Sequence, residues 1–253
     1  MISIRNVSKS FANLKAVDDL VLEVPKGEVF CFLGPNGAGK TTTIKMMTGL
    51  LKPSSGTVEL LGFNIQTQPL AAKKVTGLVP DTPALYEKLT AREFILFMGN
   101  LYGVARNTLH KRLNNLIELF DLEERVDDLI QSFSHGMKQK CALAAALIHD
   151  PQILFLDEPT AGLDPKSAKN LKDLLRGLVK QGATVFMSTH ILEIAETMCD
   201  RIGIINQGKL IACGTMDELR KLSQQQDQTL EDIFLELTGG DKYDDVLKYL
   251  EDK

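Results

Sequence analysis

The chain has 253 residues, 44% of them hydrophobic and 25% charged, a composition typical of a globular protein with enough apolar residues for one large domain or two small ones. Its net charge of −4 provides no basic excess for binding nucleic acid, and its uncharged apolar runs are far shorter than the roughly 18 residues of a membrane span. Any membrane role is therefore expected to depend on a partner. The four cysteines are scattered among apolar residues without metal-type spacing, which predicts reduced thiols in a cytoplasmic protein.

Short runs rich in Val, Ile and Leu alternate with helical patterns through most of the sequence. This alternation predicts an α/β fold with a mostly parallel central sheet and an N-terminal antiparallel β part. The expected strands are Ile2–Val7, Leu20–Val24, Val29–Leu33, Thr57–Leu61, Val75–Val79, Ile153–Leu156, Thr184–Met187, Ile202–Ile205 and Lys209–Cys213.

The stretch between Pro80 and Ile153 has helical patterns throughout. Thr90 and Glu93 have the spacing of a capping box, which predicts the start of a helix. A second amphipathic helix is indicated by the spacing of Leu109, Leu113, Leu116, Ile117 and Phe120. We interpret residues 82–150 as a helical subdomain inserted into an α/β domain of residues 1–222.

The remaining segments predict one long helix, one hairpin and a tail. Asp164-Pro165 opens a helix that carries leucines at helical spacing and ends at Gly182. The Asn206-Gln-Gly208 turn joins two short strands as a hairpin. Residues 223–253 are expected to form a polar linker and a tail that contains a short helix opened by Thr229.

A glycine-rich segment joins the expected strand Val29–Leu33 to a helical pattern. Its residues are Gly34, Pro35, Asn36, Gly37, Ala38, Gly39, Lys40, Thr41 and Thr42, and they match the pattern G-x-x-x-x-G-K-[ST]. Glycines let backbone N–H groups curl around an anion, and the helix that follows adds the positive end of its dipole. The segment therefore predicts a site for a nucleoside triphosphate, although a simple strand-to-helix turn would also use glycines.

The segment ILFLDEP ends a second expected strand with two adjacent carboxylates, Asp157 and Glu158. Neighbouring residues on a strand point in different directions, so two separate roles are expected rather than a pair sharing one proton. One carboxylate can hold Mg²⁺ together with the Thr41 hydroxyl, while the other orients or deprotonates a water molecule. The simpler interpretation is a strand end with solvated acids.

Four segments in a fixed order resemble the ATP-hydrolysing subunits of ATP-binding cassette (ABC) transporters. They are GPNGAGKTT, FSHGMKQK, LFLDEPTAGLDP and STH, within residues 1–215. The resemblance implies a P-loop NTPase that binds ATP and Mg²⁺ and forms a head-to-tail dimer, a homodimer or a heterodimer with a second ATPase subunit. It also implies membrane-spanning partner subunits, and hence a location at the cytoplasmic face of the membrane.

The resemblance assigns roles to individual positions. Ser134 and Gly136, in a signature that departs from Leu-Ser-Gly-Gly-Gln, would contact the γ-phosphate bound by the opposite chain. His190 would contact the γ-phosphate of its own site. Phe11 would stack on adenine, with a core phenylalanine as the alternative. Asp164 would lie in the cross-dimer loop, and it would also serve as a helix cap.

Asp81 stands where the family has a glutamine that touches the metal or water. An aspartate is shorter and charged, so a metal contact is expected to remain possible while the link to the helical subdomain is altered. This residue, the unusual signature and the segment TLEDIFLELTG resemble exporters whose ATPase and membrane subunits are separate chains.

Two functions from different classes follow. The first is the ATPase of a transporter that exports a drug, lipid, polysaccharide or peptide. The second is a soluble cassette ATPase that acts on ribosomes or nucleic acid, but such proteins usually carry two cassettes or coiled-coil insertions and basic surfaces, which are absent from this sequence. A small-molecule kinase or GTPase shares only the glycine-rich loop. We therefore favour transport and no nucleic-acid partner.

Overall fold

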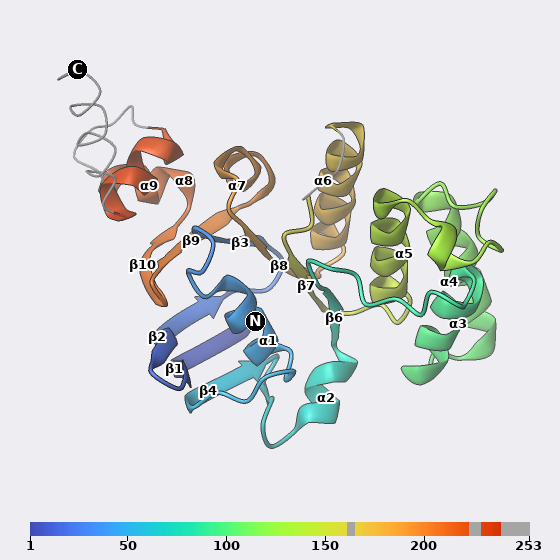
Figure 1. The fold of residues 1–253 in the computed structure, drawn as a ribbon, viewed down its shortest axis with the longest axis horizontal. Coiled ribbons are helices and arrows are strands. Elements are labelled where there is room, and N and C mark those ends of the chain that lie inside the picture. The colour runs from blue at the N-terminus through green and yellow to red at the C-terminus, as the bar shows by residue number, and fades with distance from the viewer. Residues whose placement is uncertain (161–164, 223–228, 239–253) are drawn as a thin grey trace.

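The computed structural model describes residues 1–160, 165–222 and 229–238. The chain folds into two β-sheets and a set of helices, with α3, α4 and α5 gathered at one end of the molecule (Figure 1). The strands are β1 (Ile2–Phe11), β2 (Leu14–Val24), β3 (Val29–Leu33), β4 (Ser55–Leu60), β5 (Phe63–Asn64), β6 (Thr76–Val79), β7 (Ile153–Asp157), β8 (Thr184–Thr189), β9 (Arg201–Asn206) and β10 (Lys209–Gly214). The helices are α1 (Lys40–Met47), α2 (Pro69–Lys74), α3 (Ala91–Leu101), α4 (Arg106–Leu119), the 3-10 turn η1 (Ile130–Ser132), α5 (His135–Leu147), α6 (Pro165–Lys180), α7 (Leu192–Met198), α8 (Met216–Leu222) and α9 (Leu230–Thr238).

The predicted α/β fold is confirmed, with both the antiparallel and the mostly parallel sheet. The N-terminal sheet is antiparallel in the order β2-β1-β4-β5, and the central sheet has the order β10-β9-β3-β8-β7-β6. Strands β9, β3, β8, β7 and β6 run parallel, and only β10 returns antiparallel through the predicted hairpin. Strand β5 and helix α2 were not anticipated, because both are too short to carry a clear periodic pattern.

Alternation along the central strands divides the core into two halves. Phe30 and Phe32 of β3 face α1 and the antiparallel sheet, where their rings pack against Phe186 with centroids 5.3 Å and 5.5 Å apart. Val29, Cys31 and Leu33 face the other half of the core, to which helices α3 to α9 contribute. Strand β3 is therefore buried on both faces, as its continuous apolar run predicts.

Three helices and a 3-10 turn lie between β6 and β7. The predicted capping box is confirmed, since Glu93 N–H donates to Thr90 Oγ1 at 3.1 Å and Thr90 N–H donates to the Glu93 carboxylate at 2.9 Å. Leu109, Leu113 and Ile117 form the buried face of α4, as predicted. The expectation of helix throughout was wrong for residues 80–90 and 120–129, which form turns and bends where the helical spacing breaks.

The C-terminal helix α9 begins where the sequence predicts. Thr229 and Asp232 bond reciprocally, each backbone N–H donating to the other side chain, and so cap its first turn. The predicted linker 223–228, the cap residue Asp164 and residues 239–253 lie outside the described part of the chain. Within the described ranges, no helix has the length and apolar character needed to cross a membrane.

Candidate functional site

The glycine-rich loop is shaped by close backbone contacts at two of its glycines. A Cβ atom on Gly34 would lie 2.3 Å from the carbonyl oxygen of Ile205, and one on Gly39 would lie 2.5 Å from that of Ala16. Gly39 also has a φ of 108° at the N-cap of α1, a conformation that L side chains rarely adopt. No other residue fits these two positions without moving the backbone.

Hydrogen bonds to neighbouring strands and their turns fix the two ends of the loop. Gly208 N–H, in the turn between β9 and β10, donates to the carbonyl of Ala38 at 2.9 Å. Gly34 N–H donates to the carbonyl of Thr189 at the end of β8, at 3.2 Å. Pro35, Asn36 and Gly37 remain exposed. The loop is thus fixed at both ends while its middle faces outward, where an anion could reach its N–H groups.

The ammonium of Lys40 lies inside this loop. Its side chain is only 6% exposed, and its Nζ donates to the carbonyls of Gly34 at 2.7 Å and Pro35 at 3.2 Å. It also lies 3.3 Å from Oε1 of Glu158, at the end of β7. The glycine-rich loop and the acidic strand end, more than 100 residues apart in the chain, therefore meet at one cation.

The two adjacent carboxylates have different partners and do not bond to each other, and Glu158 lies just beyond the end of β7. Asp157 is buried and accepts a 2.5 Å hydrogen bond from Ser188 Oγ. Glu158 follows with a φ of 49°, and its backbone N–H approaches the same Ser188 Oγ at 3.1 Å. A positive φ is strained for a residue with a side chain and is common at functional sites. Here it accompanies the turn of the Glu158 side chain toward Lys40.

His190 lies on the other side of the Glu158 carboxylate. Its Nδ1 is 3.0 Å from Glu158 Oε2, an ion-pair distance, although this oxygen accepts no well-aligned hydrogen bond from the described residues. The histidine side chain is 45% exposed, whereas that of Glu158 is 13% exposed. Lys40, Glu158 and His190 thus form one cluster that opens to solvent at the imidazole.

The remaining candidate residues are distributed over other parts of the molecule. Ser134 caps α5, where its Oγ accepts from Met137 N–H at 3.3 Å, and α5 lies well apart from α1 (Figure 1). A Cβ on Gly136 would meet no atom within 4 Å, so this glycine borders open space. Phe11 is 46% exposed with Lys9 Nζ 5.1 Å from its ring centroid, so the alternative of a core phenylalanine was wrong.

Thr41 and Asp81 are both exposed. Thr41 lies in the first turn of α1, one residue after Lys40. Asp81 follows β6 in an irregular segment, among residues that are mostly exposed. The donor set fits a hard cation, because Thr41 supplies a hydroxyl and Asp157 supplies a carboxylate, and oxygen atoms are the ligands that Mg²⁺ prefers.

Sequence reasoning missed the contribution of Ser188. This serine stands directly opposite Asp157 in the parallel pairing of β7 and β8. Its hydroxyl bridges the Asp157 carboxylate and the Glu158 backbone, so it fixes both acids at once. Only the register of the sheet makes this visible, since 31 residues separate Ser188 from Asp157.

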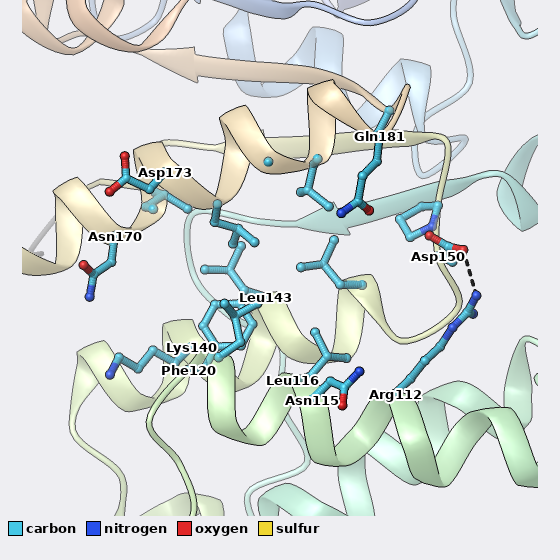
Figure 2. Close-up of a pocket in the computed structure, with 18 of the residues that line it drawn as sticks. Arg112, Asn115, Leu116, Phe120, Lys140, Leu143, Asp150, Asn170, Asp173 and Gln181 are labelled. Carbon is cyan, nitrogen blue, oxygen red and sulfur yellow. Dashed lines mark hydrogen bonds and ion pairs between the residues drawn. The ribbon is translucent and has the colours of Figure 1, made fainter.

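Sequence reasoning also missed a groove between α4, α5 and α6 (Figure 2). It has a volume of about 1060 Å³, a floor of leucines and Phe120, and a polar rim that includes Lys140 and Asp173. The ion pair between Arg112 and Asp150, 2.7 Å long, closes one end. None of Lys40, Glu158 and His190 lines it, so the groove is separate from the cluster.

Comparisons with known proteins identify the family. Residues 17–161 match the family described as ABC transporter, which is more than half of the chain. The chain belongs to the ABC transporter family. It is 41% identical over 219 residues to the linearmycin resistance ATP-binding protein LnrL of Bacillus subtilis (strain 168), covering 87% of this chain and 70% of LnrL.

Solved structures agree with this ABC assignment. A structure described as the ATP-binding subunit of an ABC transporter has a TM-score of 0.89 and 32% identity, and the match covers 94% of this chain and 99% of that one. The ATP-binding cassette MJ0796, solved as a dimer with ADP and Pi after hydrolysis, has a TM-score of 0.79 and 25% identity over 85% of this chain and 99% of its own. This ABC protein is therefore an ATP-binding, ATP-hydrolysing subunit.

Lys40→Ala tests the binding loop of this ABC ATPase. The change removes the ammonium that the loop encloses, and we expect ATP affinity to fall by about a hundredfold, since truncating one partner of a buried charge contact costs about 2–5 kcal/mol. Fluorescent-nucleotide titration measures this. Lys45→Ala, an exposed lysine near the end of the same helix, is the matched control and should bind ATP normally. Unchanged affinity in Lys40→Ala would refute the assignment of the loop.

Proposed function

We propose that this ABC ATPase powers the export of a substrate through separate membrane-spanning subunits, to which it binds at the cytoplasmic face of the membrane. The observation that carries the proposal is the Lys40, Glu158 and His190 cluster at the glycine-rich loop. The similarity to LnrL, which is named for resistance to linearmycin, supports the export direction. The substrate class is a drug, lipid, polysaccharide or peptide, and the alternative of a ribosomal or nucleic-acid ATPase gains no support from these relatives.

Each residue of the cluster has a role in hydrolysis. Lys40 and the N–H groups of the loop bind the β- and γ-phosphates of ATP. Glu158 accepts a proton from the attacking water; its carboxylate lies between the ammonium of Lys40, 3.3 Å from Oε1, and the imidazole of His190, 3.0 Å from Oε2. His190 contacts the γ-phosphate and stabilises the charge that develops there.

Mg²⁺ would be held by Thr41 and Asp157, with Asp81 as a further carboxylate. The metal, when bound, neutralises charge on the phosphates. Asp157 suits this role because its hydrogen bond from Ser188 Oγ to Oδ1 fixes the carboxylate. The charge of Asp81 distinguishes this chain from relatives that have a glutamine at that position.

The functional unit proposed for hydrolysis is a head-to-tail dimer, either of two copies or with a second ATPase subunit. Ser134 and Gly136 would complete the ATP site of the opposite chain, which fits the open space around Gly136 and the exposed N-terminus of α5. Asp164 would lie at the same interface. Phe11 would stack on adenine from the exposed end of β1. The dimeric form of MJ0796 supports this arrangement.

The helical subdomain of residues 82–150 would transmit the ATP cycle to the membrane subunits. Tyr86 and Phe97 are exposed at its surface, with ring centroids 5.7 Å apart, and Tyr86 lies five residues after Asp81. An exposed pair of aromatic rings is typical of a contact surface. The segment from Asp81 to Tyr86 therefore links the proposed metal site to the proposed partner surface.

Glu158→Gln tests the catalytic role. The amide fills the same space but cannot accept the proton of water, so we expect ATP binding to persist while hydrolysis falls by about 10²–10⁴-fold. Release of phosphate measures the rate, and size-exclusion chromatography with ATP should detect a trapped dimer. Glu193→Gln, on the exposed face of α7, serves as the control. Hydrolysis at the wild-type rate would show that Glu158 is not the base.

A mixing experiment tests the shared site. Ser134→Arg should abolish hydrolysis without weakening ATP binding to the monomer, because the bulky cation blocks the site of the opposite chain. When Ser134→Arg and Lys40→Ala subunits are combined, both lesions fall on one composite site of the heterodimer and leave the other intact. We expect part of the ATPase activity to return. Full hydrolysis by a strictly monomeric wild type would contradict the shared site.

Asp81 is tested by its effect on metal dependence and coupling. Asp81→Asn removes a negative charge near the triphosphate, and we expect a higher Mg²⁺ concentration for half-maximal hydrolysis. Asp81→Gln should alter stimulation by the membrane partner more than the basal rate. A Mg²⁺ titration of basal and partner-stimulated ATPase activity measures both. Equal titrations for both variants and wild type would show that Asp81 is only a polar residue after a strand.

A further inference from the structure

Helix α9 contacts the elements on both sides of the catalytic cluster. Its first backbone N–H, on Leu230, donates to Glu196 Oε1 of α7 at 3.2 Å. At its other end, the carbonyl of Thr238 accepts a bond from Asn206 Nδ2, 3.5 Å long, at the end of β9. The helix therefore connects α7 to the β9–β10 hairpin, on the side of the molecule opposite the helices α3, α4 and α5 (Figure 1).

The contact of α9 with α7 is relevant to His190, because the histidine lies just before α7. Helix α7 begins two residues after the histidine and has only seven residues, too few for a stable helix without packing. Ala195 and Met198 of α7 are buried in the core cluster that also contains Leu230 and Ile233 of α9, whose side chains are at most 1% exposed. Helix α7 also packs against β3 and β8, and α9 adds an apolar contact and the bond to Glu196 to this support.

The contact with the hairpin bears on the glycine-rich loop. Asn206 immediately precedes the turn in which Gly208 N–H donates to the carbonyl of Ala38. The carbonyl of Gly208 in turn accepts from Asp18 N–H at 2.9 Å, so this turn is bonded on both sides. The β9–β10 hairpin therefore bonds to α9 through Asn206 and to the glycine-rich loop through Gly208.

These two contacts give α9 a role in the geometry of the site. The imidazole of His190 must meet a phosphate that the loop holds, and a displacement of about 1 Å in such a site can cost about a hundredfold in rate. We propose that α9 is a positioning element, which holds α7 and thereby the imidazole of His190 at a fixed place relative to the glycine-rich loop. This inference rests on the role proposed above for His190.

Steady-state ATPase kinetics of the full chain test the inference. Glu196→Ala removes the hydrogen-bond acceptor at the start of α9, and Ile233→Ala removes a buried apolar contact of the same helix. We expect each change to lower kcat by about tenfold, while KM for ATP changes by less than about twofold. Glu196→Gln keeps an acceptor oxygen and should rescue kcat. Leu235→Ala, 43% exposed on the same helix, is the matched control and should behave as wild type.

A double-mutant cycle separates positioning from general destabilisation. If α9 acts through His190, adding Glu196→Ala to His190→Ala lowers kcat no further than His190→Ala alone. Thermal unfolding monitored by circular dichroism establishes that each variant is folded at the assay temperature. Glu196 is exposed, so we expect Glu196→Ala to fold and to test the inference even if Ile233→Ala does not fold.

Three outcomes would overturn the inference. The first is that Glu196→Ala is folded and has the wild-type kcat, while His190→Ala has a lowered kcat. This result would leave the proposed role of His190 intact and remove only that of α9. The second is a multiplicative loss in the double mutant, because α9 would then act elsewhere. The third is a wild-type rate for His190→Ala, which would remove the proposed role of His190 and the inference together.

Discussion

The structure of the site depends on one almost buried cation. An ammonium at 6% exposure must have partners, because an unpaired charge away from water is costly. Lys40 finds them in two carbonyls of its own loop and in the carboxylate of Glu158. Because β8 lies between β3 and β7, this contact spans a neighbouring strand and ties the loop to the acidic strand end.

The parallel strands bring the chemistry to one edge of the sheet. The loop follows β3, His190 follows β8, and Glu158 follows β7, and these three strands are neighbours in that order. Carboxyl ends of parallel strands meet at the same edge, where α/β proteins commonly bind ligands. At this edge the Ser188 hydroxyl bonds both the Asp157 carboxylate and the Glu158 backbone N–H.

One end of the molecule supports this edge of the sheet. The hairpin and α9 support the loop and α7 from one end, through hydrogen bonds and a shared apolar core. The helices α3, α4 and α5 occupy the other end, and the groove beside α6 is lined by side chains from α4 and α5 (Figure 2). Support for the cluster and the exposed signature residues therefore belong to separate parts of the chain.

Local sequence determined most of the elements and the identity of the candidate catalytic groups. The apolar run of β3, the capping box at Thr90 and the spacing of Gly34, Gly39 and Lys40 are patterns within short segments, so they are visible without the fold. Alternation along a strand predicted separate roles for Asp157 and Glu158, and the structure gives them different partners, although Glu158 lies beyond the end of β7 with a positive φ. By contrast, the turns at residues 80–90 and 120–129 and the short elements β5 and α2 escaped prediction, because short segments carry little periodic signal.

Only the tertiary structure decided which distant residues meet. The pairing of Lys40 with Glu158, the bridging hydroxyl of Ser188 and the two contacts of α9 depend on strand order and register. The sequence also could not decide whether Phe11 is buried or exposed, because an aromatic residue at a strand end suits either a core or a surface. Local patterns carry no information on these contacts, since they join residues 30 to more than 100 positions apart and form only when the whole sheet assembles.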